Sequence, residues 1–291
     1  MTVATDTRIQ ELQAELDDLT GASGIECVPG VSMCVLDGDQ IYDLTSGIAN
    51  RLSGEAVQPE TLFRIASITK TYTATLVMQL AEQGRVDLDR PLVEQLPEFR
   101  LARPEDTAAV TPRQLLSHTS GISGDLEFPA ARGDDALRKW VAKLEDLQPL
   151  FSPGVTHSYS NAGFNVLGRL VEYLLGIPWE VALREKITDP LGLSNTVTLP
   201  EEVIPKLHAL GHRTDTEKNE LKPLETWSAD RGSAPCGEIS ASARDLIAFA
   251  RMHLDGGAGP DGVRLLKPET VASMQVEQVK LPPHGIADAW G

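Results

Sequence analysis

The sequence is short of basic residues and of long apolar runs. Lysine and arginine total 26 against 42 aspartate and glutamate residues, so the formal net charge of the 291-residue chain is −16. A surface this acidic argues against nucleic acid and anionic membranes as partners, because both carry negative charge. No stretch approaches the roughly 20 apolar residues that a membrane-spanning helix needs. Residues 1–20 also lack the basic start and apolar run of a secretion signal.

Cysteine is scarce as well. Cys27, Cys34 and Cys236 are odd in number and have no metal-ligand spacing, so we interpret them as buried free thiols. Free thiols are typical of a reducing compartment, and with the missing signal they predict a cytoplasmic protein. His208 and His212 have the spacing of a helical metal pair, but a glycine between them weakens the helix and no glutamate follows the first. We therefore expect no metal site and no cofactor.

The remaining composition is that of a globular protein, with 41% hydrophobic and 23% charged residues. Residues 31–36 and 41–45 predict a hairpin around a turn at residues 37–39. Residues 67–83 and 160–175 predict long helices, each followed by a glycine. Weaker helical patterns cover residues 1–20, 112–117, 179–187 and 241–254, the last with Ser240 as its expected N-cap, whereas residues 213–222 predict a surface loop. Trp140 and Trp179 are expected in the core or lining a cleft.

The candidate nucleophile is Ser67, three residues before Lys70 at the start of a predicted helix. Residues at this spacing lie on one helix face, with Cβ atoms about 5–6 Å apart. The N-terminus of a helix also favours developing negative charge. Because a serine hydroxyl becomes a good nucleophile only when a neighbouring base takes its proton, the pair predicts an acylating serine.

A second polar cluster, Tyr159 and Asn161, stands at the start of the pattern over residues 160–175. Tyrosine can accept a proton if a nearby ammonium lowers its pKa from about 10, and Lys70 is the obvious ammonium. Asn161 offers a donor and an acceptor to a substrate amide or ester. Taken alone, the cluster is better explained by a buried tyrosine and an asparagine helix cap.

Together these segments resemble the class C β-lactamase and penicillin-binding-protein superfamily, which includes related esterases and D-aminopeptidases. The matching segments, in order, are Phe63–Lys70, Leu115–Gly121, Pro153–Gly163, Pro190–Leu193 and Gly237–Phe249. The resemblance implies an α/β (α+β) fold of the β-lactamase/transpeptidase type, in which helices flank an antiparallel sheet and a mostly helical subdomain is added. Residues 1–291 are then one incomplete domain: residues 1–66 form an N-terminal helix and sheet hairpin, residues 67–236 the mostly helical region with the site, and residues 237–291 a return helix and loop.

The resemblance also implies a two-step acyl transfer. Ser67 attacks the substrate carbonyl and forms an acyl-enzyme, while Lys70 and Tyr159 share the proton transfers; which of the two is the acylation base stays open. Asn161 orients the substrate, and Trp227 is expected to face it. The backbone N–H of Ser67 supplies one half of an oxyanion hole.

The superfamily's third motif, Lys/His-x-Gly on an inner sheet strand, is not convincingly matched, because His284-Gly285 lacks the spacing. We expect the missing C-terminal strands to be deleted or carried by a second chain. Two functions follow from the sequence. The first is a serine hydrolase of a small-molecule ester, amide or lactam, with an intracellular esterase, peptidase or acyltransferase favoured by the missing secretion signal. The alternative is a catalytically inactive binding or scaffold domain. His118 is expected to be a structural hydrogen-bonding residue.

Overall fold

The computed structural model describes residues 3–21, 28–124, 126, 128, 131–224, 230–281 and 289–290. The chain forms two compact units that are interleaved in sequence. The first unit takes residues 1–64, 193–228 and 239–250, and the second takes residues 65–192, 229–238 and 251–291. Small antiparallel sheets and many helices make up the described residues, which confirms the predicted mixture of helix and sheet.

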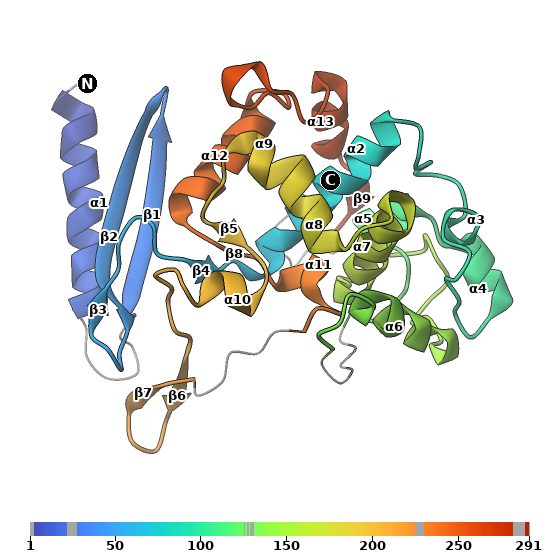
Figure 1. Ribbon diagram of the computed structural model, residues 1–291, viewed down its shortest axis with the longest axis horizontal. Helices are drawn as coiled ribbons and strands as arrows, with labels where there is room; N and C mark the ends of the chain where they lie inside the picture. Colours follow the sequence, from blue (N-terminus) through green and yellow to red (C-terminus); the bar gives the residue numbers. More distant parts are fainter. Residues whose placement is uncertain are drawn as a thin grey trace. The chain divides into compact units, whose positions relative to one another are not determined.

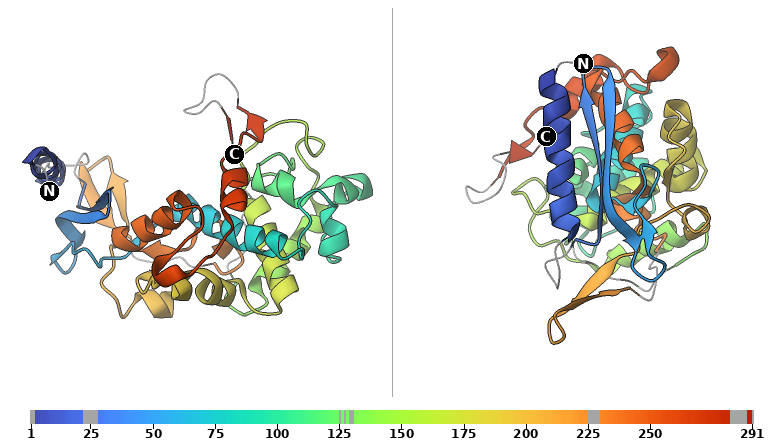
Figure 2. Two further views of the ribbon diagram at one scale, coloured as in Figure 1. Left: turned by 90° about the horizontal axis from the view of Figure 1, so that it is seen from above. Right: turned by 90° about the vertical axis from the view of Figure 1, so that its left-hand side faces the viewer.

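The first unit is built on the predicted hairpin. Strand β1 (Gly30–Asp37) pairs antiparallel with β2 (Gln40–Asn50). The chain turns between them at Gly38, whose φ of 59° is one that glycine adopts without steric cost. Helix α1 (Val3–Gly21) runs alongside the two strands (Figures 1 and 2), and Gln13 of this helix donates a hydrogen bond to a β2 carbonyl.

Short elements complete the first unit. They are β3 (Glu55–Ala56), β4 (Phe63–Arg64), β5 (Thr196–Val197), α10 (Pro200–Val203), β6 (His212–Asp215), β7 (Glu220–Pro223) and β8 (Ser240–Ala241). The loop predicted over residues 213–222 is wrong, because β6 and β7 form a hairpin there. Its strands are mostly polar and Leu221 is their single aliphatic residue, so no sustained apolar alternation marks it. An ion pair of 2.5 Å between Lys222 and Asp215 links its strands.

Helix α12 (Ala243–Leu254) begins later than predicted. The expected cap, Ser240, lies in strand β8 and pairs with β4 and β5. Ser242 caps the helix instead, since its hydroxyl accepts a hydrogen bond from the Asp245 N–H at 3.2 Å. A serine two residues further along therefore does what the pattern assigned to Ser240.

The second unit contains the two long predicted helices (Figure 1). A 3₁₀ turn, η2 (Ala66–Ile68), leads into α2 (Thr69–Glu82), and α2 packs against α7 (Asn161–Leu175) and the short α11 (Ala234–Gly237). The glycines predicted to follow the two long helices both have positive φ, which confirms those helix ends. Fully buried apolar side chains of α2 and α7 form the core here: Tyr72, Leu76, Val77, Val166, Leu167 and Leu170.

Shorter elements surround these helices. They are α3 (Leu92–Gln95), α4 (Pro104–Ala109), α5 (Pro112–Leu116), α6 (Ala136–Ala142), α8 (Trp179–Leu183), α9 (Asp189–Leu191), α13 (Pro268–Met274), β9 (Val279–Lys280) and β10 (Ala289–Trp290). The helix predicted over residues 179–187 is α8 followed by a π-helical turn. Trp140 and Trp179 are both buried, as expected. None of the described helices has the length and apolar character to cross a bilayer.

Candidate active site

Ser67 lies in the turn η2, where it is exposed at the entrance to helix α2. Ala66, directly before it, has a φ of 46°. A left-handed conformation costs an L-residue roughly 1–2 kcal/mol, and such conformations are concentrated at functional sites. The predicted position of Ser67 at a helix N-terminus is therefore found, on a locally strained turn.

Lys70 connects Ser67 with two other segments. Its side chain is 4% exposed. The ammonium Nζ donates to Ser67 Oγ at 3.2 Å, to Asn161 Oδ1 at 2.7 Å and to the carbonyl oxygen of Cys236 at 2.8 Å. Three acceptors match the three N–H bonds of an ammonium, so this buried charge is fully hydrogen-bonded.

Asn161 is the first residue of α7, and it does not cap this helix. Ser160 is the N-cap, because its hydroxyl accepts a hydrogen bond from the Gly163 N–H at 3.1 Å. The Asn161 side chain instead holds Lys70. The interpretation of Asn161 as a helix cap is thus wrong.

Tyr159 lies over Lys70 with 39% of its surface exposed. The Lys70 ammonium is 4.9 Å from the centre of the tyrosine ring, which is a cation–π contact. The sequence argument expected Lys70 near Tyr159, and the structure brings the two residues together.

His118 holds the segment that carries Tyr159. It is fully buried, and its carbonyl accepts a hydrogen bond from the Ser158 N–H at 2.9 Å. Its ring Nδ1 accepts another from the Ser160 N–H at 3.0 Å, so the ring proton is on Nε2. Burial, with the positive charges of His157 and Lys70 adding to it, lowers the pKa of His118 to about 3. The structural hydrogen-bonding role expected for this histidine is confirmed.

Cys236 enters the site through its backbone, which sequence reasoning missed. Its carbonyl oxygen accepts from Lys70, and the Thr73 hydroxyl donates to the carbonyl of the preceding Pro235 at 2.8 Å. Burial raises the pKa of the Cys236 thiol to about 11, so the sulfur stays protonated near neutral pH. Every residue type has a backbone carbonyl, so the sequence could not show that the carbonyl of Cys236 accepts a hydrogen bond from Lys70.

Comparison with known proteins identifies the family. A sequence model described as Beta-lactamase matches residues 12–290. The chain belongs to the beta-lactamase family. It is similar to penicillin-binding protein 4 of Amycolatopsis lactamdurans, with 40% identity over 265 residues, covering 90% of this chain and 68% of that protein. It is also similar to esterase EstB of Burkholderia gladioli, with 32% identity over 185 residues, covering 57% of this chain and 46% of the esterase.

A solved structure confirms the predicted fold of this family member. The crystal structure of SurE superimposes with a TM-score of 0.84 and 30% identity, covering 99% of this chain and 63% of that one. The chain thus spans 46% to 68% of the length of these three relatives. Two expectations stay predictions. One is that C-terminal strands complete the domain, and the other is that the domain is subdivided at residues 66 and 236.

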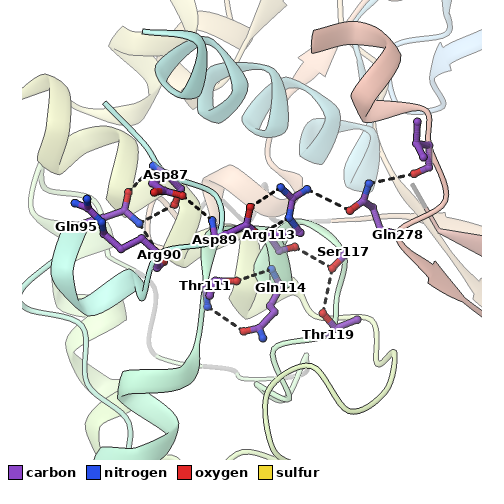
Figure 3. Close-up of polar contacts among 11 residues, drawn as sticks. Asp87, Asp89, Arg90, Gln95, Thr111, Arg113, Gln114, Ser117, Thr119 and Gln278 are labelled. Carbon is purple, nitrogen blue, oxygen red and sulfur yellow. Dashed lines mark hydrogen bonds and ion pairs between the residues drawn. The ribbon is translucent and has the colours of Figure 1, made fainter. Parts of the chain in front are cut away.

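A polar network anchors the segment that ends in His118 (Figure 3). The Arg113 guanidinium of α5 donates to both carboxylate oxygens of Asp89, at 2.6 and 2.8 Å, and holds the pKa of that carboxyl below its usual value. The Ser117 hydroxyl donates to the Arg113 carbonyl at 2.9 Å and lies 3.1 Å from the Thr119 hydroxyl. A capping box closes the other end of α5. The helix is therefore fixed at both ends next to His118.

The remaining sequence candidates do not join this site. His208 forms a β-bridge with Leu62, and His212 lies in strand β6, so the two histidines are not a helical metal pair. Within the described part of the chain, no three His, Cys, Asp or Glu side chains are grouped as metal ligands. Trp227, predicted to face substrate, lies outside the described residues.

Proposed function

We propose that this chain carries the acylation site of a serine hydrolase, which forms an acyl-enzyme through Ser67 and acts on a small-molecule ester, amide or β-lactam. The observation that carries the proposal is the Lys70 ammonium, which is hydrogen-bonded to both Ser67 and Asn161. Membership of the beta-lactamase family and the names of the relatives, an esterase among them, support the same chemistry.

In the first step, Ser67 Oγ forms a bond to the substrate carbonyl carbon as its proton leaves. The base that takes that proton is either Tyr159 as a phenolate beside the Lys70 ammonium, or Lys70 as a neutral amine. It passes the proton to the leaving group, whose bond to the carbonyl breaks. The released group is an alcohol from an ester or an amine from an amide. In the second step, water gives up a proton to the same groups and its oxygen bonds to the acyl carbon. The bond from that carbon to Ser67 Oγ then breaks, and the proton returns to Ser67.

Two further groups assist this chemistry. The Ser67 N–H, at the start of α2, is one donor of the oxyanion hole, a contribution worth about 3–4 kcal/mol in related sites. Lys70 donates a hydrogen bond to the amide oxygen of Asn161. The amide NH₂ group of Asn161 is therefore left to donate a hydrogen bond to the substrate. The resemblance assigns the second oxyanion donor to the strand of the third motif.

Hydrolysis of p-nitrophenyl acetate and of nitrocefin by the 291-residue chain tests the proposal. Ser67→Ala is expected to lower kcat/KM at least about 1,000-fold, because nucleophile and bases act as a unit. Ser273→Ala is the matched control, since it removes an exposed hydroxyl of α13 that the proposal does not use. Unchanged turnover in Ser67→Ala would refute the assignment of the nucleophile. No turnover of any substrate by the unaltered chain would favour the alternative, an inactive binding domain.

A further inference from the structure

The main chain on both sides of Tyr159 is hydrogen-bonded to one buried residue. His118 accepts the N–H of Ser158 through its carbonyl at 2.9 Å and the N–H of Ser160 through its ring at 3.0 Å. The two bonds fix the backbone before and after Tyr159, so the origin of the tyrosine side chain cannot shift without breaking one of them. The position of Tyr159 is therefore determined by a residue some forty positions earlier in the chain.

The same histidine also limits the side chain of Tyr159. The rings of His118 and Tyr159 are 4.4 Å apart and inclined by 31°, and Phe164 of α7 lies 5.2 Å from the histidine ring. Tyr159 thus has the imidazole against its ring and the Lys70 ammonium 4.9 Å from its centre. Its remaining freedom is small, although it is one of the more exposed aromatic residues.

Three properties of histidine are used at this position. His118 has a φ of 58°, which asparagine, aspartate and histidine tolerate better than other side chains. It needs a side-chain acceptor for the Ser160 N–H, and it needs a flat ring against Tyr159. Asparagine meets the first two requirements and phenylalanine only the third, so the two substitutions separate the hydrogen bond from the ring contact.

The residues after His118 continue the same contact with the Tyr159 segment. The Thr119 carbonyl accepts from the Gly154 N–H at 2.7 Å, and the Gly121 carbonyl accepts from the Leu150 N–H at 2.8 Å. A Cβ on Gly124 would lie 2.5 Å from the Tyr159 carbonyl oxygen, so the two backbones are in direct contact. Backbone hydrogen bonds and close packing against residues 118–124 therefore fix the path of residues 150–160.

We propose that His118 is a positioning residue of the acyl transfer, which sets Tyr159 over Lys70 so that the phenol can exchange protons at the Ser67 site. The inference rests on the proposed function, since it assigns His118 to the same reaction. It touches neither substrate nor reacting atoms, and it acts only through Tyr159.

A double-mutant cycle tests whether His118 acts through Tyr159. We expect His118→Phe to lower kcat/KM for p-nitrophenyl acetate 10- to 100-fold, as for a misplacement of about 1 Å. In a Tyr159→Phe background, His118→Phe should lower kcat/KM less than about twofold, because the phenol hydroxyl that His118 positions is absent. His118→Asn should retain more activity than His118→Phe. Equal losses in both backgrounds, or a larger loss in His118→Asn, would overturn the proposal.

A second measurement needs no turnover and separates this inference from the proposed function. The chain has four tyrosines, and labelling with 3-fluorotyrosine gives each a ¹⁹F resonance, that of Tyr159 being the one lost in Tyr159→Phe. We expect His118→Phe to shift or broaden the Tyr159 resonance and to leave that of Tyr173, on α7, unchanged. Gly124→Ala is the positive control, since its Cβ would lie 2.5 Å from the Tyr159 carbonyl oxygen and should shift the same resonance.

If His118→Phe fails to fold, His118→Asn decides the matter, because it keeps an acceptor for the Ser160 N–H and removes the ring contact with Tyr159. An unchanged Tyr159 resonance in folded His118→Phe, or in His118→Asn where His118→Phe does not fold, would overturn the proposal. If Ser67→Ala retains full turnover, the proposed function fails, whereas the ¹⁹F result still shows whether His118 positions Tyr159.

Discussion

A single methyl group added at Gly168 should disturb the hydrogen bonds of Lys70 indirectly, through Pro235 and Cys236. Gly168 lies on α7 against Pro235 of α11, and a Cβ there would be 2.2 Å from Pro235 Cγ and 2.6 Å from its Cβ. Carbon atoms in contact are normally about 3.5–4.0 Å apart, so the rigid proline ring must move by about 1 Å. The next residue, Cys236, carries the carbonyl that accepts from Lys70.

Opposing effects determine how much Gly168→Ala changes the free energy of unfolding. Replacing glycine by alanine inside a helix stabilises it by about 1 kcal/mol. Overpacking costs about 1–3 kcal/mol. Weakening of the buried hydrogen bond from Thr73 to the Pro235 carbonyl costs about 1 kcal/mol more. We expect Gly168→Ala to lower the free energy of unfolding by about 1–3 kcal/mol, and to reduce kcat/KM about 10- to 100-fold as the Cys236 carbonyl leaves Lys70.

Urea unfolding with Gly163→Ala as a control provides the assay. Gly163 is on the same helix, but a Cβ there would meet only ordinary contacts, the shortest being 3.5 Å to the side chain of Leu115. This variant should gain stability from helix propensity, by up to about 1 kcal/mol. If Gly168→Ala is as stable as Gly163→Ala, the contact with Pro235 does not constrain α11 and the reasoning is refuted.

Two further predictions concern local conformation and pH. Ala66→Gly should relieve the left-handed strain before Ser67 and raise the free energy of unfolding by up to about 1 kcal/mol, as measured by urea titration, and a loss of stability would contradict the strain. Because the pKa of His118 is about 3 in the fold and 6.5 in an unfolded chain, protonation of the unfolded state removes stability as pH falls from about 6.5 towards 3. The wild-type chain should therefore lose about 2 kcal/mol more than His118→Asn between pH 7 and pH 5, as followed by urea unfolding at each pH. Equal losses in the two proteins would contradict a neutral buried His118.

The parts of the site that sequence could predict are those fixed by local geometry. Ser67 and Lys70 are three residues apart, and the start of one helix brings them together wherever the helix packs. The glycines after α2 and α7 mark real helix ends for the same reason. Residue chemistry suggested that Lys70 lies near Tyr159, about ninety residues later, and the resemblance to a family added Asn161 and made the grouping specific.

The parts that could not be predicted depend on backbone atoms and on packing. The Cys236 carbonyl holds Lys70, and any residue type could supply that oxygen. His118 adopts a positive φ and accepts hydrogen bonds from the backbone on both sides of Tyr159. No periodicity in the sequence reveals either feature. The hairpin of β6 and β7 is mostly polar, with Leu221 its single aliphatic residue, so it has the composition of a loop. In each case the information lies in contacts between distant segments.

The site of a covalent adduct shows whether Ser67 is the nucleophile. The 291-residue chain is treated with a fluorophosphonate probe and digested, and the modified residue is identified by mass spectrometry. We expect a single adduct on Ser67, no labelling of Ser67→Ala, and labelling of Lys70→Ala at least about 100-fold slower than the wild-type rate. An adduct on another residue, or equal labelling of Ser67→Ala, would contradict this assignment of the nucleophile.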